Sequence, residues 1–98
     1  MYRGTTPINI FTVDADLTTA EVIYITYKQG CQVVIEKDID EIEVAADKLT
    51  VRLSQEDTLK FDYREVEIQI RARYSDGTAI ASNIIKTTIE HILKDGVI

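Results

Sequence analysis

The chain has 98 residues, of which 45% are hydrophobic and 29% are charged. These proportions are typical of a globular domain and exclude a disordered or fibrous chain, and the length predicts a single domain over residues 1–98. Seventeen acidic residues against 11 Lys and Arg give a net charge of −6, which disfavours nucleic acid and anionic membrane surfaces as partners.

The chain has one cysteine, Cys31, and one histidine, His91. A lone cysteine forms no internal disulfide, which favours a reducing compartment, and the two residues together supply too few ligands for structural zinc. The first residues lack the apolar segment of a secretory leader, and no apolar run approaches the roughly 20 residues of a membrane-spanning helix. We therefore expect a protein made in the cytosol, with no membrane segment and no bound cofactor.

Apolar residues recur mainly with period two from Ile8 to Tyr74, which predicts strands with one buried face. The first three strands are expected over Ile8–Val13, Glu21–Lys28 and Cys31–Glu36. Gln29-Gly30 is expected to form the turn of a hairpin between the second and third. On the third strand, Cys31, Val33 and Ile35 share a face, so we expect Cys31 to be a core residue.

The next part of the chain predicts two shorter strands and a helical turn. The apolar faces of the two strands are expected to be Ile42, Val44 and Ala46, and then Leu49, Val51 and Leu53, with a turn at Asp47-Lys48. Ser54 is a potential helix N-cap, and Asp57 follows it three residues later. This pair predicts one short helical turn over Gln55–Lys60, after which Phe61 would cap the core.

The sixth strand has the clearest pattern. Its expected inner face is Val66, Ile68, Ile70, Ala72 and Tyr74. An Asp-Gly turn at Ser75–Thr78 then leads into Ala79–Leu93, where the apolar residues also fit a helical stripe. We favour a strand as far as Glu90, because the β-branched run Ile84–Ile89 is costly in a helix.

Seven short strands at roughly ten-residue spacing predict an all-β protein, a single immunoglobulin-like antiparallel β-sandwich, or else a small barrel. The helical turn before the sixth strand resembles the corner between the fifth and sixth strands of immunoglobulin-like domains. There an Asp precedes an aromatic residue by four positions, as Asp57 precedes Phe61. The cysteine pair and the buried Trp of antibody domains are absent from this sequence.

The sequence predicts no catalytic, cofactor-binding or metal-binding residue. No nucleophile is placed near His91, which we expect at the surface or at a strand end. The acidic run offers a calcium loop as an alternative, but it lacks the central glycine of such loops. We expect it instead to form the solvated face of a strand, where charge prevents unwanted edge pairing. The run comprises Glu36, Asp38, Asp40, Glu41, Glu43 and Asp47.

Five tyrosines could form a platform for sugars or peptides, which makes an immunoglobulin-like ligand- or carbohydrate-binding module the alternative function. However, Tyr24 and Tyr27 have opposite parity and should lie on opposite faces of their strand. Tyr74 belongs to the expected inner face, and Tyr2 and Tyr63 are expected in loops. We therefore favour core or ordinary surface roles for the tyrosines.

Several segments together resemble small prophage and phage structural proteins of Gram-positive bacteria and, more remotely, the N-terminal β-sandwich domains of phage baseplate upper proteins. These segments are Arg3-Gly4-Thr5-Thr6-Pro7, Tyr27-Lys28-Gln29-Gly30, Leu53-Ser54-Gln55-Glu56-Asp57-Thr58, Gln69-Ile70-Arg71, Ser75-Asp76-Gly77-Thr78 and Ile92-Leu93-Lys94-Asp95-Gly96-Val97-Ile98. The resemblance implies a non-enzymatic tail or baseplate component. Such a component would be assembled in the bacterial cytoplasm into the virion, as a homo-oligomeric ring and with other phage structural proteins.

Strand addition to an open sheet edge is a physical route to such assembly. The segments expected to take part are the N-terminal arm Tyr2–Pro7 and the C-terminal tail Lys94–Ile98. Within them, Tyr2, Arg3, Val97 and Ile98 are the candidate interaction residues.

Overall fold

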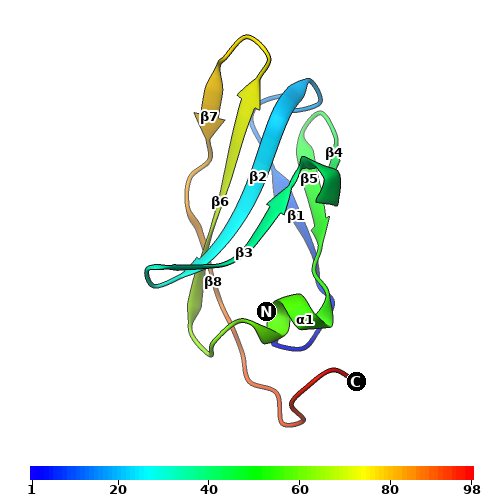
Figure 1. The fold of residues 1–98 in the computed structure, drawn as a ribbon, viewed down its shortest axis with the longest axis vertical. Coiled ribbons are helices and arrows are strands. Elements are labelled where there is room, and N and C mark those ends of the chain that lie inside the picture. Colours follow the sequence, from blue (N-terminus) through cyan, green and yellow to red (C-terminus); the bar gives the residue numbers. More distant parts are fainter.

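Two antiparallel sheets pack face to face in the computed structural model, which describes residues 1–98 (Figure 1). The larger sheet has the order β3-β2-β6, followed by β7 and β8, which both pair with β6. Its strands are β2 (Ala20–Gln29), β3 (Gln32–Asp38), β6 (Glu65–Tyr74), β7 (Ala79–Ala81) and β8 (Ile85–Thr88). The smaller sheet has the order β1-β5-β4, with β1 (Ile8–Thr12), β4 (Ile42–Val44) and β5 (Lys48–Arg52).

Two short helices complete the fold, the 3-10 helix η1 (Ile39–Glu41) and the α-helix α1 (Gln55–Leu59). The predicted all-β antiparallel sandwich, with one helical turn before its sixth strand, is confirmed. At α1, Ser54 accepts a hydrogen bond from the Asp57 N–H at 3.1 Å, and Asp57 accepts one from the Ser54 N–H at 2.9 Å. The two residues therefore form the capping pair that their spacing predicts.

The strand order differs at one position from the seven-strand immunoglobulin arrangement. There the second strand lies between the first and the fifth, whereas here β2 lies between β3 and β6 in the opposite sheet. The smaller sheet therefore has only three strands. Because β7 and β8 follow one another along β6, the larger sheet is one strand position wider than the smaller sheet.

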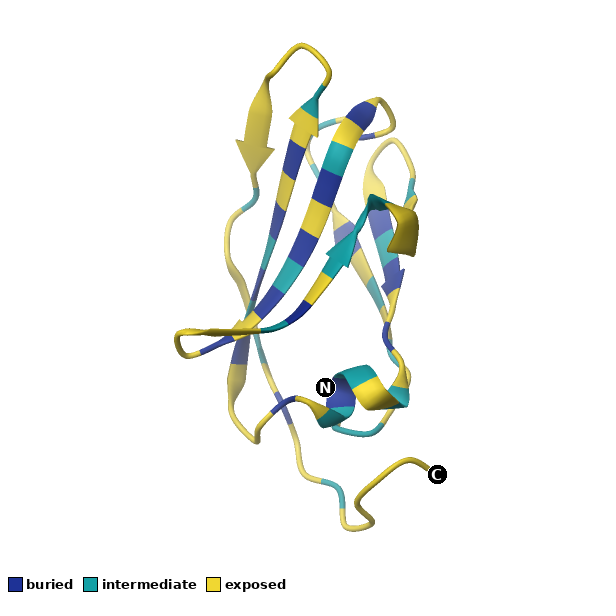
Figure 2. Cartoon of the chain, viewed as in Figure 1, coloured by how far each residue is buried: buried dark blue, intermediate teal, exposed yellow.

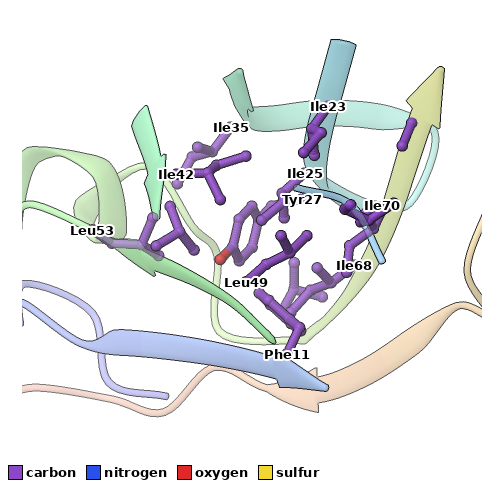
Figure 3. Packing of buried hydrophobic residues seen from close by; sticks show 14 of the residues in the cluster. Phe11, Ile23, Ile25, Tyr27, Ile35, Ile42, Leu49, Leu53, Ile68 and Ile70 are labelled. Carbon is purple, nitrogen blue, oxygen red and sulfur yellow. The ribbon is translucent and has the colours of Figure 1, made fainter. Parts of the chain in front are cut away.

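A cluster of 17 buried hydrophobic residues lies between the sheets (Figure 3). On β6, Val66, Ile68, Ile70 and Ala72 are buried as predicted, and Tyr74 is half-buried at the edge of the cluster. The alternation of buried and exposed residues along β2 and β6 is visible in Figure 2. The predicted inner face of β5 is confirmed too, because Leu49, Val51 and the following Leu53 are all buried.

Two aromatic side chains occupy the part of the core nearest α1. Tyr27 and Phe61 pack with their ring centroids 6.0 Å apart and their planes tilted by 52°. Burial raises the pKa of Tyr27 to about 12, although the hydrogen bond from Asn9 acts in the opposite direction. Phe61 therefore caps the core, as its position after the predicted turn suggested.

The start of β3 differs from the prediction. The pairing between β2 and β3 shifts between Tyr27 and Lys28, so that Val34 has no partner and forms a β-bulge. Because of this extra residue, the side chains before Val34 point to the opposite face of the sheet from the one that simple alternation predicts. Val33 is therefore 53% exposed, whereas Ile35 is buried. The turn is Gly30-Cys31 rather than Gln29-Gly30, and Gly30 has the positive φ of +59° that it requires. The prediction that Cys31 is a core residue is therefore wrong, because Cys31 is exposed on this turn.

The acidic run departs from its predicted strand at both ends. Glu41 lies in η1 and not on a strand, because Asp38 caps this helix and the Glu41 side chain accepts the Asp38 N–H in return. At the other end β4 stops at Val44, and Ala46, expected on the inner face, is exposed.

The segment after the Asp-Gly turn forms strands and no helix, but the predicted single strand is interrupted at Ser82–Ile84. Ser82 forms two hydrogen bonds with the backbone of Ile70 on β6. Its N–H donates to the Ile70 carbonyl at 2.9 Å, and its Oγ accepts from the Ile70 N–H at 3.0 Å. A side-chain hydroxyl thus replaces one backbone partner, which divides the strand into β7 and β8.

Candidate functional site

The residues considered for catalysis lie in exposed segments. Cys31 is on the β2–β3 turn, and His91 follows β8. The His91 ring stacks on Tyr63 with a centroid distance of 3.6 Å and an angle of 23° between the planes. His91 therefore has a packing partner at the surface, beyond the end of its strand, where the sequence placed it.

The side chain of Lys37 forms ion pairs with two carboxylates, Glu41 of the acidic run at 3.2 Å and Asp57 of α1 at 3.0 Å. No three His, Cys, Asp or Glu side chains in residues 1–98 are grouped closely enough to hold a metal ion. Partial burial opposes the charge of Lys37, but the hydrogen bonds and charges of Asp57 and Glu41 outweigh it and raise the pKa of Lys37. Burial likewise acts to raise the pKa of Asp57, yet the Ser54 N–H and Lys37 hold it below its ordinary value. This ion pair ties β3 to α1.

Asp57→Asn is expected to make the free energy of unfolding depend less on pH under acidic conditions. Since the pKa of Asp57 is lowered below 3.8 in the folded protein, its stabilising effect is complete above that pH and is lost as the pH falls through the lowered pKa. Asn keeps an oxygen for the Ser54 N–H but loses the charge that attracts Lys37. Urea unfolding near neutral pH should show the variant less stable by about 1 kcal/mol. The difference should shrink near pH ~3; an equal difference at both pH values would contradict this assignment.

The N-terminal segment is bound to the segment that follows β8. Tyr2 and Glu90 form a parallel bridge, and the Glu90 N–H donates to the Met1 carbonyl at 2.8 Å. Gly4 makes the close approach possible, because its φ is +71° and a Cβ there would lie only 3.0 Å from Cδ1 of Ile92. The two terminal segments therefore lie side by side at the α1 end of the molecule (Figure 1).

Of the candidate interaction residues, Arg3 is engaged inside the molecule. Its guanidinium donates to the Leu59 carbonyl at 2.9 Å and to the Tyr63 hydroxyl at 3.1 Å, and it lies 3.3 Å from the Asp95 carboxylate. It also lies 5.2 Å from the centroid of the Tyr63 ring. Only 17% of its side chain is exposed, so Arg3 joins the terminal segments to α1 and Tyr63. Tyr2, by contrast, is exposed.

Leu93 extends the predicted C-terminal tail Lys94–Ile98, so that the tail is the exposed segment Leu93–Ile98, which is coloured as exposed in Figure 2. Leu93 is fully exposed, Ile98 is 86% exposed and Val97 is 55% exposed. Polar contacts hold the tail. The Ile98 N–H donates to the Gln55 side chain at 2.9 Å, and the Gln55 amide donates to the Ile98 carbonyl at 3.2 Å. The tail thus presents apolar surface to solvent, including the predicted residues Val97 and Ile98.

A groove opens on the side of the sandwich where the larger sheet extends beyond the smaller one. The register places Ile80 opposite Ala72 and Ile85 opposite Ile68, so both isoleucines face inward. They are nevertheless 37% and 40% exposed. The groove has a volume of about 410 Å³, and eight of its 12 lining residues are hydrophobic. Those eight are Val13, Ala15, Leu17, Ile70, Ala72, Ile80, Ala81 and Ile85.

Sequence reasoning did not identify this groove. The sequence predicts Ile80 and Ile85 in a strand, but the pattern of one strand carries no information on whether the opposite sheet is wide enough to cover that strand. The one usable signal is the odd number of predicted strands, because seven strands cannot form two sheets of equal width. The candidate residues chosen from the sequence lie in the terminal segments, whereas the groove lies between β7, β8 and the loop after β1.

The tyrosines are distributed over different parts of the surface. Tyr24 is exposed on the larger sheet and Tyr27 is buried, which confirms that they lie on opposite faces of β2. Tyr2 lies in the N-terminal segment, and Tyr63 lies in the loop between α1 and β6, where one face of its ring stacks on His91. The hydroxyl of Tyr74 donates to the Asp16 carbonyl at 2.7 Å. The exposed rings therefore do not line one strand face, as a flat sugar platform would require.

Neither of the two helices has the length and apolar character needed to cross a bilayer. No protein-family model matches the sequence, and comparisons with curated proteins and with solved structures found no significant match.

Proposed function

We propose that this protein is a non-enzymatic structural module that assembles with other proteins, as a tail or baseplate component of a phage or prophage. The observation that carries the assembly role is the open side of the sandwich, where the inward-facing residues Ile80 and Ile85 are partly exposed. Apolar surface of this kind costs solvation until a partner covers it. The resemblance of the chain's segments to phage structural proteins supports the proposal that the partners are proteins of a phage particle.

Two free sheet edges flank the open side and support assembly through backbone contacts. β1 pairs only with β5, and β7 and β8 pair only with β6, so one edge of each strand has no strand partner. An extended segment of another protein can bond to such an edge while its side chains enter the groove. Under this proposal the protein is made in the bacterial cytoplasm and becomes part of the virion.

Purified particles test the proposal directly. After induction of the host's prophage, particles banded on a density gradient should contain this protein in a fixed ratio to the major tail protein, measured by quantitative mass spectrometry. Mixing the purified protein with the products of neighbouring genes should give a complex of defined mass by light scattering. Particles that lack the protein, together with a failure to bind any neighbouring product, would contradict the proposal.

A further inference from the structure

We propose that an extended segment of a partner protein pairs with the free edge of β1 and becomes a fourth strand of the smaller sheet. The segment has aliphatic residues at alternate positions and a basic residue at its N-terminal end. This inference rests on the proposed assembly function and names the contact through which the protein assembles. The larger sheet is one strand position wider than the smaller sheet, so a fourth strand fills the place that faces β7 and β8.

The backbone groups of β1 point alternately to β5 and to the free edge. Pro7 accepts a hydrogen bond from the Leu53 N–H at 3.1 Å, and Val13 donates one to the Asp47 carbonyl at 2.9 Å. Both bonds lie on the β5 side, so the odd-numbered residues of this segment bond toward β5. The even-numbered residues therefore point their N–H and C=O groups to the edge that has no strand partner. These residues are Ile8, Ile10 and Thr12. An added antiparallel strand can exchange two hydrogen bonds with each of them.

β1 lacks the features that protect the other sheet edges against strand addition. It has no charged residue, no proline and no bulge. By contrast, the outer strand β3 of the larger sheet contains a bulge and the charged run Glu36–Asp38. On the other side of that sheet, β7 and β8 have three and four residues and are separated by Ser82–Ile84. β4 at the far edge of the smaller sheet has three residues. β1 is therefore the edge best suited to accept a strand.

The pairing determines where the side chains of the added strand point. Residues directly opposite one another in an antiparallel pair lie on the same face of the sheet. Segment residues opposite Asn9 and Phe11 therefore point inward, where they cover the partly exposed Ile80 and Ile85 of the groove. Segment residues opposite the even-numbered residues of β1 lie on the outer face, beside the two exposed isoleucines of that strand. The segment therefore needs an aliphatic residue at every second position.

The groove also favours a positive charge at one end of the segment. Asp14 follows the end of β1 and is the only charged residue among the 12 that line the groove. It belongs to no ion pair of this chain. In antiparallel pairing the N-terminal end of the segment lies beside the C-terminal end of β1, so a lysine or arginine there meets Asp14.

A second copy of this chain does not fit the edge of β1. Two copies of β1 cannot pair about a two-fold axis, because each larger sheet extends one strand position past its own β1 and the two larger sheets would overlap. In the tail Leu93–Ile98 no two aliphatic residues lie two positions apart, and Gly96 has a φ of +85°, outside the strand region. Hydrogen bonds to α1 hold the arm Tyr2–Pro7. The segment therefore belongs to a different protein.

The end-blocked peptide Lys-Val-Thr-Ile-Thr-Val-Thr is the probe, with its aliphatic residues at the inward positions and its threonines at the positions that bond β1. Amide hydrogen exchange of the whole chain, measured by NMR, reports where it binds. At a peptide concentration about ten times the dissociation constant, exchange at Ile8, Ile10 and Thr12 should slow roughly tenfold. The amides of Asn9 and Phe11 bond toward β5 and should be protected with or without the peptide.

Matched changes in the protein and in the probe test each part of the contact. Ile85→Asn should raise the dissociation constant roughly tenfold, because Ile85 faces the inward residues of the probe. Ile84→Asn is the control, since Ile84 is also exposed but does not line the groove. N-methylation of the probe's threonines should abolish binding, because it removes the N–H groups that the β1 carbonyls accept and leaves the aliphatic residues unchanged. Glutamate in place of the probe's lysine should weaken binding at low salt.

The inference and the proposed function fail in different experiments. Unchanged exchange at the three β1 amides, equal binding of the N-methylated probe, or an equal loss in Ile84→Asn and Ile85→Asn when circular dichroism shows both folded, overturns the inference. A complex with a neighbouring gene product in which those three amides stay unprotected also overturns it and leaves the assembly role in place. A protein that binds the probe at β1, but is absent from particles and binds no neighbouring product, overturns the proposed function and leaves the β1 site.

Discussion

Phe61→Ala is expected to lower the free energy of unfolding by about 3–5 kcal/mol, the usual cost of removing a buried phenylalanine ring. Phe61 is 1% exposed and packs against Tyr27, so the lost ring leaves a cavity where α1 leads into β6. Since a domain of this size has a total stability of about 5–15 kcal/mol, the variant should lose a large fraction of its stability.

Urea unfolding followed by circular dichroism measures this effect. Ile10→Ala is the control, because it also shortens a large hydrophobic side chain, but at a position that is 61% exposed. It should change the stability by no more than about 0.5 kcal/mol. A similar loss in both variants would show that Phe61 does not hold this part of the core.

Gln29→Leu is expected to have the second largest effect, a loss of about 1–3 kcal/mol, because the Asp62 main-chain N–H loses its hydrogen-bond partner and two main-chain carbonyls each lose one of two donors. The Gln29 side chain is 2% exposed and bonds three such groups in the loop before β6. It donates to the carbonyls of Asp62 at 3.0 Å and Arg64 at 3.3 Å, and it accepts from the Asp62 N–H at 2.9 Å. Leucine fills a similar volume but bonds none of them.

Gln29→Glu separates the hydrogen bonds from the packing. Glutamate still accepts the Asp62 N–H, but when ionised it has no proton to donate and its charge faces two carbonyl oxygens. Its penalty relative to the wild type should therefore be large near neutral pH and smaller near pH ~4, where a protonated carboxyl can donate one bond. A Gln29→Leu variant as stable as the wild type would contradict this role for the side chain.

The sandwich was predictable where local patterns decide the structure. β6 alternates over its whole length, and the Ser54–Asp57 pair specifies the start of α1, so both elements lie where the sequence placed them. Gln29 lies on the same face of β2 as the buried residues Ile25 and Tyr27, so the alternation along this strand also predicts that Gln29 is buried.

The remaining features depend on contacts between distant segments. The bulge at Val34 changes which residues of β3 face the core, and nothing in the local alternation specifies it. The break between β7 and β8 depends on Ser82 bonding to Ile70 on a different strand. The groove exists because β2 joins the larger sheet, a choice of strand order that no single strand reveals.

The exposed turn that connects β2 and β3 gives this protein a natural position for a spectroscopic label. Cys31 is the only cysteine, and it is exposed, so a maleimide dye attaches at one defined place without any substitution. In the proposed assembly, labels on neighbouring copies would stand at a separation set by the contact between those copies. Energy transfer between differently coloured copies would therefore report how the copies are arranged.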